Sequence, residues 1–222
     1  MSYYTTDAEQ KEKLLKWWKE YGWATILGVV LAVVIVVGWQ VYRRHQLHQA
    51  QQASLVYATM MSSSYAHDLS SAKSAANALS TQYSGTSYAD MAHLWLAAQA
   101  ANAKHYQQAL SELKQVSEHG HMKALRQIAV LREASIQLQL KQPSLALKAL
   151  DTVYDKGFIA RVNEYKGDAY WQMNQPEKAR AHYQQAVAQY QKAGVPAPAV
   201  AMKLAGVPNI TPHHLNTTGS NA

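Results

Sequence analysis

The sequence predicts an all-α protein in which one membrane-spanning helix is followed by a solenoid of helical pairs. Three observations predict it. Alanine and glutamine are abundant, whereas the chain holds only 10 glycines, 6 prolines and one phenylalanine. Residues 21–42 form a single uncharged stretch. Beyond this stretch, small residues recur with a period of about 34 residues, which is typical of stacked helical pairs.

The uncharged stretch has the length of a bilayer-spanning helix. At about 1.5 Å per residue, a helix over residues 21–42 is roughly 33 Å long, which matches the hydrocarbon core. The run exits through GWQVYRRHQ, which lacks the small residues of a signal-peptide cleavage site, so we expect a permanent anchor. A buried core helix would need apolar cover on every face. Aromatic residues stand at both ends, as at membrane interfaces: Trp17, Trp18, Trp23, Trp39 and Tyr42.

The charges that flank the span favour one orientation. Four lysines precede it within residues 1–20, and only Arg43 and Arg44 follow it within the next twenty residues. The positive-inside rule then favours residues 1–20 on the cytoplasmic side and residues from 43 onward on the outer face, which in a bacterium is the periplasm. Arg43 and Arg44 lie directly against the span and favour the opposite orientation.

The helix is expected to continue past the span. No glycine or proline lies between Gly38 and Gly85, and a second helical stretch through Ala75 and Leu79 ends at the turn-forming YSGTSY. An amphipathic stripe with spacings of three and four marks the continuation: Leu47, Ala50, Ser54, Tyr57 and Met61.

The stretch YKGDAYWQMNQPEKARAHYQQAV carries the spacing of a tetratricopeptide repeat in Gly167, Tyr170, Ala179, Tyr183 and Ala186. The glycine and the alanines allow two antiparallel helices to cross closely, and the tyrosines fill the space beside the crossing. Asn163 and Lys166 stand where tryptophan and leucine are usual, so the unit is degenerate.

Earlier parts of the chain repeat this pattern. Ala75, Ala109, Ala146 and Ala179 are separated by 34, 37 and 33 residues, which predicts about four helical pairs over residues 43–206. A short capping helix is expected after Pro198, and residues 207–222 show no periodicity and are predicted to be a disordered tail.

The first helix of each pair lines the concave groove of a tetratricopeptide stack. The usual register predicts a mainly apolar groove for an extended or helical segment of another chain, and the competing interpretation of these residues is ordinary inter-helix core. The groove residues are Met91, Leu94, Ala98, Ile128, Leu131, Leu138 and Trp171, with Arg161, Glu164 and Asp168 as a polar end.

No residues predict catalysis, a metal or a cofactor. The chain has no cysteine, and no GxSxG, HExxH or P-loop sequence occurs. His45 with His48 and His119 with His121 have short spacings but lack further ligands nearby, so solvated surface is the preferred interpretation.

The net charge of +7 comes entirely from residues 43–222. A location on the outer face of the membrane excludes nucleic acid and leaves anionic lipid headgroups or an acidic partner. The positive residues are spread along the repeats, which favours an ordinary solvated surface.

The segments YSGTSYADMA, SEHG, LRQIAVLREA, ALDTVYDKGF, EYKGDAY and MKLAGV, in this order behind the anchor, resemble the YfgM-type ancillary subunits of the bacterial SecYEG translocon. The resemblance extends to about Val207. It implies an inner-membrane protein with a cytoplasmic N-terminus, whose periplasmic domain acts with a membrane-anchored chaperone related to prolyl isomerases beside the translocon. It implies no catalytic residue.

Two functions therefore remain in competition. One is a translocon-associated adaptor that assists emerging secretory proteins. The other is a scaffold that organises another envelope assembly, in cell division or outer-membrane biogenesis, without binding clients. An enzyme ranks third.

Overall fold

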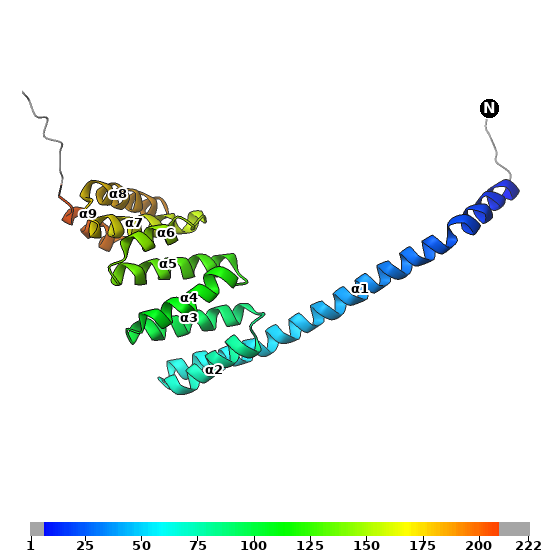
Figure 1. The fold of residues 1–222 in the computed structure, drawn as a ribbon, viewed down its shortest axis with the longest axis horizontal. Helices are drawn as coiled ribbons and strands as arrows, with labels where there is room; N and C mark the ends of the chain where they lie inside the picture. The colour runs from blue at the N-terminus through cyan, green and yellow to red at the C-terminus, as the bar shows by residue number, and fades with distance from the viewer. Residues whose placement is uncertain (1–6, 209–222) are drawn as a thin grey trace, which may run out of the picture. The chain divides into compact units, whose positions relative to one another are not determined.

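The computed structural model describes residues 7–208, with side chains from residue 11 onward, and all regular elements in this range are helical (Figure 1). The all-α prediction is confirmed. The contacts divide the chain into two units, residues 1–52 and 53–222, which are described separately. The elements are α1 (Asp7–Tyr65), α2 (Leu69–Gln82), α3 (Ser87–Asn102), α4 (Tyr106–His119), α5 (Lys123–Gln139), α6 (Pro143–Leu150), the 3₁₀ helix η1 (Lys156–Phe158), α7 (Ile159–Gln172), α8 (Pro176–Lys192) and α9 (Pro198–Gly206).

The predicted span lies inside α1, which runs for 59 residues without a break. Among the described residues, α1 is the one helix that is long and apolar enough to cross a membrane, judged by length and composition, and its apolar window is not buried by other parts of the chain. The five aromatic residues predicted for the membrane interfaces are 48% to 79% exposed: Trp17, Trp18, Trp23, Trp39 and Tyr42. The aromatic rings are therefore free to meet lipid.

The last turns of α1 form the first helix of the repeat unit. Ala53 and Met60 are fully buried there, in a cluster with Leu79 of α2 and Leu96 of α3. Because a buried methionine and leucine each contribute about 1.5–3 kcal/mol through burial, this end of α1 is an integral part of the packed core.

Each of the four helical pairs has a turn of the same geometry between its two helices. The residue two positions before each second helix has a positive φ of 56° to 61°, a left-handed conformation that is uncommon for residues with a side chain. The next residue donates its backbone N–H to a carbonyl five residues earlier, which closes the first helix. The four left-handed residues are separated by 37, 37 and 33 residues: His67, Lys104, Lys141 and Asn174.

These turns correct one detail of the predicted period. The residue five positions after each left-handed residue is a fully buried alanine, namely Ala72, Ala109, Ala146 or Ala179. Ala75, the first alanine of the series predicted from the sequence, is only half-buried, and Ala72 occupies the equivalent buried position. The period of the repeat follows from the turn, and in an alanine-rich helix a neighbouring alanine imitates it.

The pairs α3–α4, α5–α6 and α7–α8 stack in chain order, and α9 closes the stack against α8 (Figure 1). The packed domain extends one residue beyond the predicted boundary at 206, because Val207 is 3% exposed and its carbonyl accepts a hydrogen bond from Arg180 on α8. The rest of the predicted disordered tail, residues 209–222, lies outside the described residues.

Candidate partner-binding surface of the repeat domain

The last repeat contains a close crossing of α7 and α8. A Cβ atom added to Gly167 would lie 2.5 Å from two ring atoms of Tyr183, so glycine is required where the helices approach. Ala179, Tyr183 and Ala186 are buried along α8. Four of the five residues singled out in the repeat motif are therefore buried in the α7–α8 pair.

Tyr170, the fifth motif residue, is half-buried on α7. Its ring stacks on His182 of α8, with ring centroids 5.2 Å apart, and the Lys178 ammonium lies 5.3 Å from the Tyr170 ring centroid. Burial and the positive charge of Lys166 lower the pKa of His182 below its usual value. The neutral imidazole therefore packs as an aromatic residue.

The structure separates the predicted groove residues into two groups. Leu94, Leu131 and Leu138 are only 6% to 7% exposed and belong to the inter-helix core, so they are not available to a partner and the predicted register is wrong for them. The physical reason is that these leucines point between the helices of adjacent pairs. Two groove residues are exposed, Arg161 and Trp171, and three are half-buried: Met91, Ala98 and Ile128.

The first helices of successive pairs, α3, α5 and α7, instead form a face with two adjoining cavities. The cavity between α3 and α5 has a volume of about 240 Å³ and includes Asn102 and Arg132. The cavity between α5 and α7 has a volume of about 410 Å³ and includes Trp171. Gln139 and Tyr165 line both cavities. We call this surface the first-helix face.

Carboxamides recur on the first-helix face at equivalent places. Asn102, Gln139 and Gln172 each stand two residues before the left-handed residue that ends the first helix. Gln172 donates its Nε2 to the carbonyl of Leu138 at 3.0 Å, which ties α7 to α5. Carboxamides offer both a donor and an acceptor, as a peptide backbone does, so this row can hydrogen-bond an extended chain.

One end of the first-helix face carries a network of charges. Lys203 of α9 donates to Glu164 at 3.0 Å and to Asp168 at 2.7 Å. Arg161 and Tyr190 also donate to Glu164, at 3.0 Å and 3.2 Å. The sequence predicted a polar end at Arg161, Glu164 and Asp168, and the pattern gave no signal that Lys203 would join them from the capping helix.

The network shifts several proton equilibria. Burial by itself would lower the pKa of Lys203, but the contacts with Asp168 and Glu164 outweigh it and raise the pKa. Burial and a hydrogen bond to Asp168 raise the pKa of Tyr183, and burial raises that of Tyr190. The lysine is therefore charged and the tyrosines are neutral at physiological pH.

The histidine pairs weighed as metal ligands lie apart from any larger ligand set. Within the described residues, no three His, Cys, Asp or Glu side chains group together as a metal site. His121 faces Asp90, which accepts its backbone N–H at 2.7 Å, and His119 lies 3.9 Å from Glu118.

Comparison with known proteins bears on this architecture. A sequence model described as a tetratricopeptide repeat-like domain matches residues 15–209, and together with the four helical turns it defines a tetratricopeptide repeat-like protein. No solved structure gives a significant match.

The relatives narrow the class further. An ancillary SecYEG translocon subunit of Escherichia coli (strain K12) is 29% identical over 187 residues, which cover 84% of this chain and 90% of the relative. A protein of the same name in Haemophilus influenzae is 31% identical over 76% of this chain and 82% of the relative. Another in Aggregatibacter actinomycetemcomitans is 31% identical over 82% of this chain and 90% of the relative. The chain belongs to the family of ancillary SecYEG translocon subunits.

Proposed function

We propose that the protein is an inner-membrane adaptor that associates with the SecYEG translocon and presents its repeat domain to partners in the periplasm. The partners are a membrane-anchored chaperone related to prolyl isomerases and the secretory proteins that emerge beside it. The observation that carries the proposal is the similarity to named translocon subunits over most of the chain, together with a family model whose match over residues 15–209 includes both the apolar segment and the repeats.

The continuity of α1 supports a role close to the membrane. The apolar segment ends at Tyr42, and Ala53, where the packed repeat unit begins, follows after ten residues of the same helix. The separation along the chain between the apolar segment and the packed repeat unit is therefore only ten residues. A partner that acts on secretory proteins as they emerge from the translocon also works at the membrane surface.

The first-helix face supports binding of polypeptide. Its two cavities offer room for side chains, and the row of Asn102, Gln139 and Gln172 offers hydrogen bonds to a backbone. Trp171 adds an exposed aromatic surface, 47% accessible, of the kind that anchors interfaces.

The orientation has a direct test, because the chain contains no cysteine. Ser2→Cys and Gln107→Cys are each treated with a membrane-impermeant maleimide in intact spheroplasts. We expect Gln107→Cys to react and Ser2→Cys to react only after permeabilisation. The reverse pattern would refute a periplasmic repeat domain.

Partner binding is tested by photocrosslinking in the native membrane. A photoreactive residue replaces Trp23 in the apolar segment, Gln139 or Trp171 on the first-helix face, and the exposed Gln184 of α8 as the control. We expect translocon subunits to be captured from Trp23, and a chaperone or a nascent chain to be captured from Gln139 and Trp171 but not from Gln184.

The outcomes separate the parts of the proposal. Silence at Gln139 and Trp171 with translocon adducts at Trp23 would show that partners use another face. Silence toward secretion components at all four positions, with capture of cell-division or outer-membrane machinery, would refute the adaptor and establish the scaffold.

A further inference from the structure

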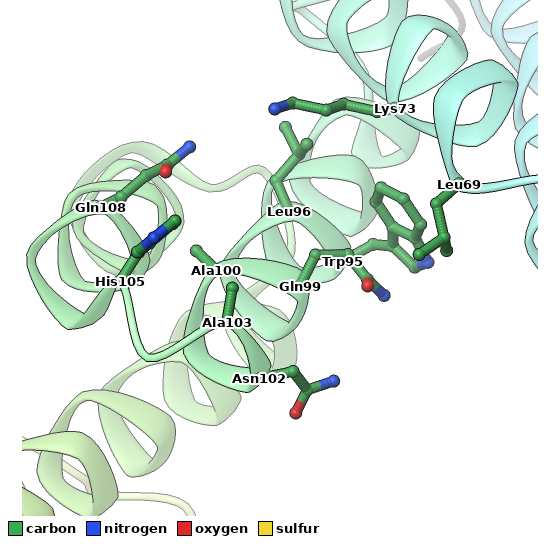
Figure 2. A pocket seen from close by; sticks show the side chains of 10 residues that line it. All are labelled: Leu69, Lys73, Trp95, Leu96, Gln99, Ala100, Asn102, Ala103, His105 and Gln108. Carbon is green, nitrogen blue, oxygen red and sulfur yellow. The ribbon is translucent and has the colours of Figure 1, made fainter.

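A separate cavity of about 410 Å³ lies between α2, α3 and the start of α4 (Figure 2). Trp95 and Leu96 contribute apolar surface from α3, and the exposed Leu69 contributes it from α2. Two basic residues also line the cavity, Lys73 of α2 and His105, which stands just before α4 (Figure 2). Asn102 lines both this cavity and the α3–α5 cavity of the first-helix face, whereas Gln139 and Trp171 line cavities of that face alone.

The cavity exists because this junction departs from the repeat. Lys73 stands six residues after its left-handed turn residue, and the equivalent positions in the next two pairs hold leucine, Leu110 and Leu147. Ala103 stands one residue before the turn, where the next two pairs hold the larger Leu140 and Met173.

The larger residues fill the same space at the next junction. Leu110 and Leu140 are both half-buried and pack against the hydrophobic cluster of α3, α4 and α5. At the junction between the first two pairs, a charged residue and an alanine replace these two leucines. A gap that could be closed by residues used elsewhere in the same repeat costs packing energy, since empty apolar space forfeits van der Waals contacts.

The polar groups around the cavity have no partners inside the described chain. No hydrogen bond or ion pair is formed by the side chains of Lys73, Gln99, His105 or Gln108 within residues 7–208. The lining includes one lysine and one histidine but no carboxylate. The site therefore combines an apolar floor with an uncompensated positive charge, which is complementary to an acidic and apolar ligand.

We propose that this cavity is a second binding site, which takes one bulky apolar side chain of a partner polypeptide and pairs a neighbouring acidic side chain with Lys73. The apolar side chain packs on Trp95 and Leu96. The unpartnered carboxamides at the rim hydrogen-bond the partner's backbone. This site does not depend on the function proposed for the first-helix face.

The test uses the full chain in phospholipid nanodiscs with all 6 tryptophans replaced by 5-fluorotryptophan. The fluorine signal of Trp95 is assigned from its loss in Trp95→Phe. Three peptides are titrated: acetyl-Gly-Phe-Glu-Gly-amide, its Gln counterpart, and acetyl-Gly-Gly-Glu-Gly-amide. We expect a saturable shift of the Trp95 signal with the first peptide, roughly three- to fivefold weaker binding of the Gln peptide, as for an exposed ion pair, and no shift with the third.

Two variants test the geometry. Lys73→Leu/Ala103→Leu copies the residues of the next pair, so it should fold with equal or higher thermal stability and abolish the shift. Lys73→Met keeps the cavity open and should bind the Glu and Gln peptides equally. Ala103→Met, which copies Met173, provides a milder closure if circular dichroism shows that the double variant is not folded.

The refuting outcomes are equally specific. An unresponsive Trp95 signal, equal affinities of the wild type for the Glu and Gln peptides, or unchanged binding by the folded, closed variants would each overturn the site. A Trp95 signal that follows the anionic lipid content of the nanodisc and ignores the peptides would assign the cavity to lipid in place of a polypeptide.

Discussion

Substitution of Gly167 by alanine probes the crossing of α7 and α8. The added Cβ would lie 2.5 Å from Cδ1 and Cε1 of Tyr183, about 0.9 Å inside the 3.4 Å at which ordinary contact begins. The ring cannot move away freely, because Tyr183 is 3% exposed and donates a hydrogen bond to Asp168 at 2.8 Å.

Two opposing effects set the magnitude. Overpacking of a well-packed core costs about 1–3 kcal/mol, and the higher helix propensity of alanine returns up to about 1 kcal/mol. Because the Tyr183 ring is buried and its hydroxyl is hydrogen-bonded to Asp168, we expect a net loss of about 1–2 kcal/mol in the free energy of unfolding. For a chain of this size that corresponds to a melting temperature about 2–8 °C lower.

The assay is thermal melting of the full chain in mild detergent, followed by far-ultraviolet circular dichroism. Gly85→Ala is the matched control, because a Cβ at Gly85 meets no atom within 4 Å and its φ is not positive. Gly167→Ala/Tyr183→Leu should melt no lower than Tyr183→Leu alone, because the ring that clashes is gone. A Gly167→Ala protein that melts at or above the wild type would refute the close-crossing argument.

Three further predictions follow from the charges of the repeat domain. Lys203→Met removes the ion pairs with Glu164 and Asp168 and should lower the free energy of unfolding by about 1–2 kcal/mol, less than the loss of a fully buried pair. The control, Lys114→Met, removes an exposed ion pair with Glu118 at 3.6 Å and should cost under about 0.5 kcal/mol in the same melting assay. The pKa of Tyr183 is raised in the folded state, so above pH 10.0 the unfolded state releases a proton that the folded state keeps. The free energy of unfolding should therefore fall as the pH rises beyond 10. In denaturant titrations, Tyr183→Phe should lose less of its free energy of unfolding over this pH range than the wild type does. Burial raises the pKa of Glu133, so its charged form is disfavoured in the folded state at neutral pH. Glu133→Gln still accepts the hydrogen bond from Ser117 and should have a higher melting temperature than the wild type at about pH 7. This difference in melting temperature should become smaller as the pH is lowered and the Glu133 carboxylate takes up a proton.

The sequence alone determined the class of the protein and the kind of elements it uses. An uncharged run of 22 residues can only satisfy its backbone as a helix in an apolar medium, so the candidate span is readable from composition. The repeat is also readable, because Gly167, Ala179 and Tyr183 are fixed by a local crossing of two consecutive helices.

The tertiary structure decided which side chains are available to a partner. Leu94 and Leu131 have the spacing of groove residues, yet they are buried, because the rotation of each first helix depends on contacts with neighbouring pairs far along the chain. The bond from Lys203 to Glu164 joins residues 39 apart, and no local periodicity encodes it. The cavity beside Lys73 likewise becomes visible only when the turns align the pairs and show which junction lacks the larger apolar residues of the next two. Periodicity reports the contacts that recur within each pair, whereas the exposure of each side chain depends on how neighbouring pairs pack against one another.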